Sequence, residues 1–302
     1  MENNIVIAVH GGAQNKDRRT FTPDLEDAYI RGLKDALKAG WNILNGNGTA
    51  LDAVEYSVRS MEDNPMFNAG TGASINRNGE TELDAAIMCG KTLMAGGVAA
   101  VKLVKNPISL ARMVMEKTGH VLLCAEGAEE FAREMGVEFK PADYFVTPAK
   151  MDEKKKEDAE GGTISKDTVG AVALDKYGNL AAATSTGGLT NKMKGRIGDS
   201  PVIGSGTYAN NEACAVSCTG DGEFIIRGVF AHLLYSIMKF KGWNLHDASR
   251  EVLKINAGQL RTEMGLIAID RLGNVELAYN TLPMFRGYRK NNEPEKMWIW
   301  ED

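Results

Sequence analysis

The stretch DTVGAVALD, residues 167–175, decides the fold, because an apolar strand pattern begins there abruptly at Thr168. The preceding residues, about 151–167, are rich in charge and glycine and have no apolar periodicity, so they are predicted to form a flexible exposed linker. A threonine that opens a buried strand directly after a linker has the pattern of a nucleophile at a newly made N-terminus. The alternative interpretation is a threonine that simply begins a β-strand, where threonine is common.

The chemistry of threonine favours such a cleavage. A threonine hydroxyl is a weak nucleophile near neutral pH, because a base must take its proton as the oxygen attacks. No histidine lies near Thr168 in the sequence. Cleavage between Asp167 and Thr168 would give Thr168 a free α-amine, whose pKa of about 8 suits a general base. One residue would then supply both the nucleophile and the base.

Composition excludes several classes of function. The chain has 302 residues, 43% of them hydrophobic, which suffices for one large core. Its net charge of -5 is dispersed, which argues against nucleic acid or an anionic membrane as a partner. The apolar stretch at 5–9 is too short for a signal peptide and no segment reaches transmembrane length, so a cytoplasmic location is predicted. The four cysteines are predicted to be buried and reduced: Cys89, Cys124, Cys214 and Cys218. The four histidines are scattered without the spacing of metal ligands, so no zinc site is predicted: His10, His120, His232 and His246.

The hydrophobic pattern predicts a single α+β domain over 1–302. Strands are predicted at 5–9, 73–76, 81–88, 97–104, 168–174, 180–184, 213–218, 266–270 and 275–279, and helices at 23–45, 50–61, 109–117, 125–135, 223–240 and 245–260. Antiparallel hairpins bury one sheet face, and long amphipathic helices need a sheet to cover. Two packed sheets with helices on both outer faces satisfy both needs.

Polar motifs follow the strands around the predicted nucleophile. Thr186 ends the strand that pairs with the Thr168 strand, so its hydroxyl is placed to orient Thr168; satisfying backbone groups is the alternative role. Arg196 and Asp199 lie on a glycine-hinged loop. A guanidinium can bind a carboxylate through two parallel hydrogen bonds, and an aspartate can bind an ammonium. Together the two side chains fit the α-carboxylate and the α-amine of an amino acid. The alternative is a solvated turn.

The segment TGDGE at 219–223 joins a predicted strand to a predicted helix. The start of a helix offers unpaired N–H groups to an anion, so an oxyanion formed by attack on an amide fits there, with help from Thr219 and the N–H of Gly220. The alternative is that Asp221 and Glu223 only cap the helix.

Together these residues resemble the plant-type L-asparaginase and isoaspartyl aminopeptidase family of N-terminal nucleophile hydrolases. The match spans nearly the whole chain, and many ordered motifs make it specific. They are HGG at 10–12, FNAGTG at 67–72, ELDAAIM at 82–88, DTVGAVALD at 167–175, ATSTGG at 183–188, NKMKGRIGDSP at 191–201, SCTGDGE at 217–223 and GLIAID at 265–270.

The resemblance implies an αββα four-layer sandwich, made as a precursor that cuts itself before Thr168. The products would be an α subunit, 1–167, and a β subunit, 168–302, which stay in one fold and form a dimer of such pairs. Carried over residue by residue, the resemblance implies Thr168 as nucleophile, Thr186 as its hydroxyl support, Thr219 and Gly220 as the oxyanion hole, and Arg196, Asp199, Gly222 and Asn68 as residues that bind the substrate. It implies no required cofactor and no catalytic metal, but a structural sodium ion in the loop about 60–69.

The predicted activity is hydrolysis of β-aspartyl dipeptides and of the side-chain amide of L-asparagine, both small-molecule substrates. Two departures from the family pattern bear on self-cleavage: Ala13 follows HGG where many relatives have a third glycine, and the linker is short. Two alternatives stay open, a glycosylasparaginase and a non-catalytic binding protein with a decayed site. The preferred leaving group, the metabolic role and the rate of cleavage do not follow from the sequence.

Overall fold

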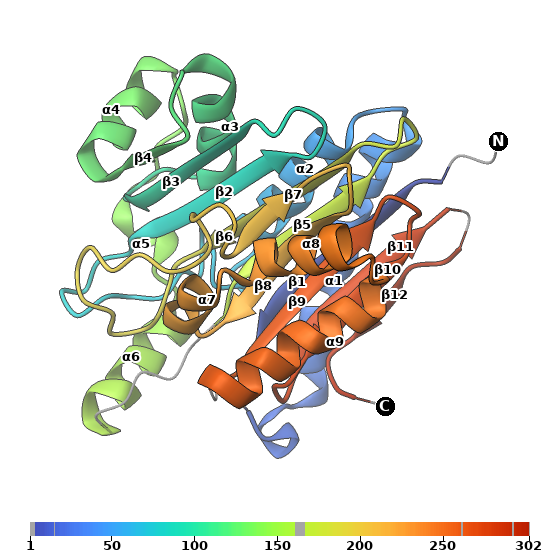
Figure 1. Cartoon of the computed structure of the whole chain (residues 1–302). Coiled ribbons are helices and arrows are strands. Elements are labelled where there is room, and N and C mark those ends of the chain that lie inside the picture. The colour runs from blue at the N-terminus through green and yellow to red at the C-terminus, as the bar shows by residue number, and fades with distance from the viewer. Residues whose placement is uncertain (1–3, 15, 161–166, 261, 292, 302) are drawn as a thin grey trace.

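The computed structural model describes residues 4–14, 16–160, 167–260, 262–291 and 293–301 and combines helices with two sheets (Figure 1). The large sheet has the order β12 (Lys296–Trp298), β11 (Met284–Lys290), β1 (Val6–Ala13), β5 (Val169–Leu174), β6 (Leu180–Thr186), β2 (Leu83–Cys89), β3 (Ala95–Val101) and β4 (Leu122–Cys124). The small sheet has the order β10 (Val275–Tyr279), β9 (Met264–Asp270), β8 (Cys214–Gly220) and β7 (Thr207–Ala209). The mixed α and β class predicted from the sequence is confirmed.

The helices lie before, between and after these strands. They are α1 (Pro23–Asn45), α2 (Ala50–Glu62), α3 (Pro107–Lys117), α4 (Ala125–Glu134), α5 (Ala142–Phe145), α6 (Pro148–Glu160), α7 (Gly222–Gly228), α8 (Phe230–Lys241) and α9 (Leu245–Ile255), with short helical turns η1 (Arg18–Thr20) and η2 (Asn256–Leu260). In the described part of the chain, no helix has both the length and the apolarity needed to cross a bilayer.

Helices and the small sheet cover opposite faces of the large sheet. α1, α2 and α3 contact the strands of the large sheet, while β8 and β9 contact β1 and β5. On β1, Ile7 and Val9 belong to the core beneath the helices, whereas Val6 and Ala8 belong to the core between the sheets, because successive strand side chains point to opposite faces. α8 and α9 cover the outer face of the small sheet (Figure 1).

Capping residues fix where the first two long helices begin. The Thr22 side chain accepts a hydrogen bond from the backbone N–H of Leu25, and Pro23 occupies the first turn of α1, where its missing N–H costs nothing. Thr49 likewise accepts a hydrogen bond from the N–H of Asp52 at the start of α2, which removes an unpaired donor of the helix terminus. Both helix starts agree with the sequence prediction.

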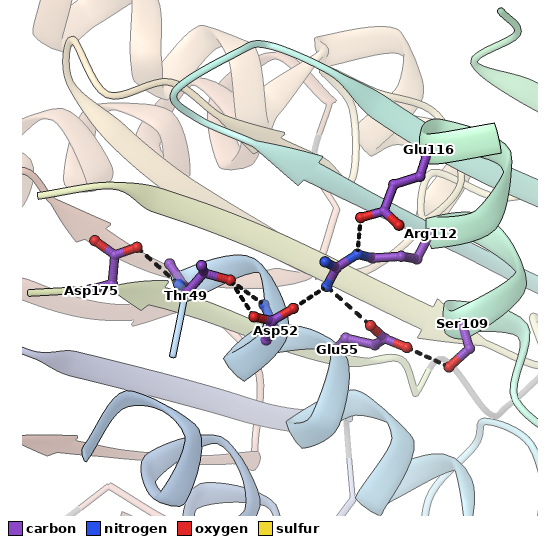
Figure 2. Close-up of polar contacts among 8 residues, drawn as sticks. Thr49, Asp52, Glu55, Ser109, Arg112, Glu116 and Asp175 are labelled. Atoms are coloured by element: carbon purple, nitrogen blue, oxygen red, sulfur yellow. Dashed lines mark hydrogen bonds and ion pairs between the residues drawn. The ribbon is translucent and has the colours of Figure 1, made fainter. Parts of the chain in front are cut away.

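A network of charges ties α2 to α3 (Figure 2). The Arg112 guanidinium donates to the carboxylates of Asp52 at 2.7 Å, Glu55 at 3.1 Å and Glu116 at 2.7 Å. Asp175, which follows β5, accepts a hydrogen bond at 3.1 Å from the first N–H of α2. These contacts fix the helices on the sheet and involve no residue of the predicted site.

The segment predicted as a flexible exposed linker, about 151–167, is exposed at most of its described positions, as predicted, but it begins as a regular helix instead of an irregular linker. Residues up to Glu160 are helical in α6, and Asp167 is buried. Ion pairs one turn apart stabilise this charged helix: Lys150–Glu153 at 2.9 Å, Lys154–Asp158 at 3.1 Å and Lys155–Asp152 at 3.2 Å. The Lys154 ammonium also donates to the Asn191 side chain at 2.7 Å. The remainder of the predicted linker, 161–166, lies outside the described residues.

The helix predicted over 223–240 is two helices that meet at Val229, whose φ is 49°. The break has a local cause, since the first N–H groups of α8 donate to backbone carbonyls of the 204–205 loop instead of to α7. The strand predicted at 73–76 is absent: the N–H of Ser74 donates to the Asn68 side chain at 2.7 Å rather than to a neighbouring strand.

The cysteines only partly follow the prediction of buried thiols. All four are free, and Cys214 and Cys218 are buried on β8. Cys124 is exposed and Cys89 is intermediate. The exposure of Cys124 follows from its place on β4, which is the edge strand of the large sheet and therefore lacks a covering neighbour on one side.

Candidate active site

Thr168 lies directly before β5, in the middle of the large sheet, and is 5% exposed. The expected hydrogen bond between Thr168 and Thr186 is present, with the Thr168 hydroxyl donating to Thr186 Oγ1 at 3.3 Å. The Thr186 hydroxyl in turn donates to the carbonyl oxygen of Asp167 at 3.1 Å and accepts from the N–H of Gly188 at 3.0 Å. Thr186 therefore connects the Thr168 hydroxyl to the carbonyl of the bond that precedes it.

Asn68 is the second group on the Asp167 carbonyl. Its Nδ2 donates to that oxygen at 2.8 Å and to the carbonyl of Gly188 at 2.7 Å. Its Oδ1 accepts the N–H of Ser74, which fixes the orientation of the amide. The Asp167 carbonyl oxygen thus accepts two hydrogen bonds, an arrangement that stabilises negative charge on this oxygen when a nucleophile attacks the carbon.

The side chain of Asp167 is held inside the protein by the segment after β1. Its Oδ2 accepts a hydrogen bond from Nε2 of Gln14. A Cβ built at Gly12, whose φ is +117°, would lie 3.0 Å from the Asp167 Cβ, so only glycine fits there. Burial raises the pKa of the Asp167 carboxyl to about 6, against the opposing positive charges of Lys16 and Lys150.

A histidine does approach Thr168 in space, although none is near it in the sequence. His10 on β1 pairs with Gly170 on β5. Its ring is buried, and burial lowers the pKa of the imidazole to about 3, so it is neutral near neutral pH. Nε2 lies 2.8 Å from Oγ of Ser217 on the small sheet. His10 therefore joins the two sheets through Ser217.

Arg196 and Asp199 converge at Gly222. A Cβ built at Gly222 would lie 2.8 Å from Asp199 Oδ1 and 2.9 Å from Arg196 Nη2. Asp199 is buried, which excludes the solvated-turn alternative for this residue. Burial raises the pKa of the Asp199 carboxyl to about 7; the Arg196 cation opposes the rise, and the charge of Glu223 adds to it. Glycine at 222 leaves both charged groups room.

Glu223 binds Arg196, which the sequence did not predict. Nε of Arg196 donates to Glu223 Oε1 at 2.8 Å, and Nη2 donates to Oε2 at 2.7 Å. The alternative of helix capping is wrong for this pair: Asp221 occupies the N-cap position of α7 without a side-chain capping bond, and its Oδ2 accepts from the Thr262 hydroxyl at 2.8 Å. No sequence signal distinguished an acid that pairs with Arg196 from one that caps α7.

A small pocket joins these groups. It is lined by Asp167, Thr168, Thr186, Gly188, Leu189, Arg196, Gly198, Asp199, Ser200 and Gly220. Its free volume is about 10 Å³, which holds roughly one water molecule. An amino acid does not fit in this space while Asp167 remains part of its wall.

The two residues predicted as an oxyanion hole lie at the end of β8. Gly220 lines the pocket and has a φ of +132°, and a Cβ there would lie 2.5 Å from the carbonyl oxygen of Glu263. Oγ1 of Thr219 accepts the N–H of Ala13 at 3.3 Å. Thr219 therefore links the small sheet to the segment after the HGG motif, while Gly220 borders the same pocket as Thr168.

Comparison with known proteins identifies the family. A family model described as Asparaginase matches residues 3–299. The chain belongs to this asparaginase family. It is 45% identical over 298 residues to the isoaspartyl peptidase of Salmonella typhimurium, covering 95% of each chain, and 44% identical over 295 residues to that of Escherichia coli, covering 94% of this chain and 92% of the relative. It is 44% identical over 278 residues to the human isoaspartyl peptidase/L-asparaginase, covering 90% and 88%.

Membership of the asparaginase family makes the chain a hydrolase, since the curated relatives that it resembles are isoaspartyl peptidases and L-asparaginases. The family match includes Thr168 and the other residues of the pocket. Sequence reasoning missed Gln14 and Glu223 because their partners, Asp167 and Arg196, are far away in the sequence. The only available signal for Gln14 was a polar residue directly after a buried strand.

Proposed function

We propose that the protein hydrolyses β-aspartyl dipeptides and the side-chain amide of L-asparagine, with Thr168 as a nucleophile that self-cleavage exposes. One observation carries the proposal: Asn68 and Thr186 both donate to the carbonyl oxygen of Asp167, next to the Thr168 hydroxyl. These donors lie where an oxyanion would develop if Thr168 attacked its own preceding carbonyl.

Self-cleavage would proceed in two steps. Oγ1 of Thr168 attacks the Asp167 carbonyl carbon and loses its proton, while the peptide nitrogen gains one and leaves, which gives an ester. Water then hydrolyses the ester, leaving a carboxylate on Asp167 and a free hydroxyl and α-amine on Thr168. The new α-amine has a pKa of about 8, which suits a base that takes the proton of the Thr168 hydroxyl when this hydroxyl attacks the substrate.

Hydrolysis of the substrate would use the same hydroxyl. The Thr168 α-amine takes the hydroxyl proton, the oxygen attacks the β-carbonyl carbon, and ammonia or an amino acid leaves with a proton. Water then releases aspartate from the ester. In our proposal the N–H of Gly220 and the Thr219 hydroxyl stabilise the substrate oxyanion; the place of Gly220 on the pocket wall supports this role. No step needs a cofactor or a catalytic metal.

The substrate clamp in this proposal consists of Arg196 for the α-carboxylate and Asp199 for the α-amine, beside Gly222 and Asn68. The assignment is supported because the two edges of the Arg196 guanidinium face different groups. Glu223 takes the Nε and Nη2 edge, whereas Nη1 lies 2.9 Å from a Cβ built at Gly198 on the pocket wall. A planar guanidinium can bind a second carboxylate through its other edge.

We propose that the fold is the αββα sandwich of N-terminal nucleophile hydrolases, and that cleavage yields an α subunit, 1–167, and a β subunit, 168–302. The order of the large sheet supports a stable pair: β1 of the first subunit lies between β11 and β5 of the second, and β6 of the second pairs with β2 of the first. The cut chains would therefore share one sheet. From the family resemblance alone we also propose that two such pairs form a dimer.

A structural sodium ion in the loop about 60–69 is part of the proposal. Hard cations prefer oxygen ligands. Two backbone carbonyl oxygens of this loop support the site, because both point toward the same space beside Gly72. A Cβ built at Gly72 would lie 2.5 Å from the carbonyl oxygen of Pro65 and 2.8 Å from the carbonyl oxygen of Phe67. The ion would hold the loop that presents Asn68 and would take no part in the chemistry.

The proposed function is tested by competition among three substrates on processed protein. We expect β-aspartyl dipeptides to have the highest kcat/KM and L-asparagine to be hydrolysed more slowly, because a dipeptide offers additional groups for binding. Glycosylasparagine is expected to be a poor substrate or none. Preferential hydrolysis of glycosylasparagine would favour the glycosylasparaginase alternative, and binding of all three without turnover would favour a non-catalytic protein.

A further inference from the structure

Gln14 binds the side chain of the residue that precedes Thr168. It follows β1 directly and is 4% exposed. Its backbone N–H donates to the carbonyl oxygen of Pro283 at 2.9 Å, which fixes Gln14 beside the start of β11. From there its Nε2 donates to Oδ2 of Asp167, 153 residues further along the chain. One amide therefore ties the residue at the proposed cut to the end of β1, the neighbour of β5 in the large sheet.

Three separate segments hold Asp167, through its side chain and through its carbonyl. Gln14 binds the side chain, and the backbone of Gly12 packs against it: a Cβ built at Gly12 would lie 2.7 Å from Oδ1 and 3.1 Å from Cα of Asp167. The carbonyl oxygen accepts hydrogen bonds from Asn68 at 2.8 Å and from Thr186 at 3.1 Å. These partners belong to the end of β1, the loop after α2 and the end of β6. A turn of either the side chain or the carbonyl would therefore break one of these contacts.

The bond from Gln14 joins a neutral donor to an ionised acceptor. Because the pKa of the buried Asp167 carboxyl is about 6, this group is mostly ionised near neutral pH. Hydrogen bonds to a carboxylate are stronger than those between neutral groups, and a buried carboxylate that loses a donor is destabilised. The Gln14 amide therefore favours the position that the Asp167 side chain has in the structure.

We propose that Gln14 is a positioning residue for self-cleavage, which keeps the carbonyl carbon of Asp167 within reach of the Thr168 hydroxyl. The inference rests on the proposed function, of which self-cleavage is the first step. Attack on the preceding carbonyl depends on the local backbone, because the two reacting groups belong to adjacent residues. Among the described residues, those that line the pocket do not include Gln14. Its effect is therefore expected on the cut and not on hydrolysis of the substrate.

The test is the rate of the cut in Gln14→Met, followed by intact mass after a pulse of cell-free synthesis. Methionine keeps the length of the side chain but has no N–H for Asp167. We expect the cut to be about tenfold slower than in wild type, because small misplacements of reacting groups cost one to two orders of magnitude. Once fully cut, the variant should hydrolyse L-asparagine with the KM and kcat of wild type. A general folding defect would lower kcat as well.

Asp167→Ala removes the same bond from its other partner and keeps the carbonyl that Thr168 attacks. It should slow the cut to a similar extent, which provides a second measurement if Gln14→Met fails to fold. In the Asp167→Ala background, Gln14→Met should slow the cut by less than about twofold, because the bond that it removes is already absent.

Asn274→Ala is the matched control. Its Nδ2 also donates to an aspartate carboxylate, that of Asp270, at 2.8 Å. Asp270 lies at the end of β9 opposite to Met264, and Met264 pairs with Gly220 of the pocket wall. The control is expected to leave unchanged both the rate of the cut and the kinetics of the processed protein.

The outcomes separate the two levels of the argument. A Gln14→Met chain that is cut as fast as wild type would overturn the positioning role, and so would equal slowing by Gln14→Met with and without the Asp167 side chain. A wild-type chain that is never cut between Asp167 and Thr168 would instead refute the proposed function.

Discussion

Replacing Thr168 by alanine is expected to leave the chain whole and to reduce hydrolysis of β-aspartyl dipeptides by at least about 10⁴-fold, as loss of a nucleophile does in other hydrolases. The alanine side chain has no oxygen to attack the Asp167 carbonyl, so neither self-cleavage nor an α-amine at residue 168 results. Steady-state assays of the variant and of processed wild-type protein, at equal concentration, measure the loss.

Thr168→Ser is the matched control for this change. Serine keeps the hydroxyl that donates to Thr186, so processing and measurable turnover are expected to remain. Hydrolysis by the alanine variant at a rate within about tenfold of wild type would be incompatible with a Thr168 nucleophile, since a nucleophile contributes far more than that.

The second large effect is expected at Arg196. Arg196→Ala should raise KM for L-asparagine and β-aspartyl dipeptides by about 100-fold, a loss of ~3 kcal/mol that is typical of charged hydrogen bonds. Self-cleavage should continue, because the Asp167 carbonyl is held by Asn68 and Thr186 and not by Arg196. Initial rates over a range of substrate concentrations give KM, and intact mass gives the extent of processing.

Arg112→Ala is the matched control for the Arg196 variant. Arg112 also binds carboxylates, but in the network between α2 and α3 (Figure 2). Its loss is expected to lower thermal stability and to leave KM unchanged. If Arg196→Ala left KM unchanged while processing stopped, the assignment of Arg196 to the substrate carboxylate would be wrong.

Local sequence signals were sufficient for the hairpins that position the nucleophile. The turn between β5 and β6 contains Gly178, with a φ of +78°, and that between β9 and β10 contains Gly273, with a φ of +80°, a conformation that favours glycine. Apolar runs on either side of each turn predicted the paired strands. The helix starts at Thr22 and Thr49 were also predictable from local sequence, because capping depends on residues only a few positions apart.

Contacts between distant segments were beyond the sequence. The charged segment of α6 has little apolar character, so its helix does not appear in the hydrophobic pattern, although its ion pairs lie three or four residues apart. Its contact with a distant segment, from Lys154 to Asn191, does depend on the folded structure. The pairing of Arg196 with Glu223 and the hydrogen bond from the N–H of Gly195 to the Glu82 carboxylate depend on folded geometry. The sequence therefore indicated Arg196 and Asp199 as candidates for the proposed clamp but did not indicate what holds Arg196 in place.

The central claim is that the chain cuts itself between Asp167 and Thr168, and intact mass spectrometry of purified protein over time tests it most directly. The account predicts that the whole chain is replaced by two fragments, 1–167 and 168–302, whose masses add up to that of the chain plus one water. Hydrolytic activity should rise in step with the second fragment. A whole chain that hydrolyses aspartyl substrates at full rate, or an active protein cut at another bond, would contradict the account.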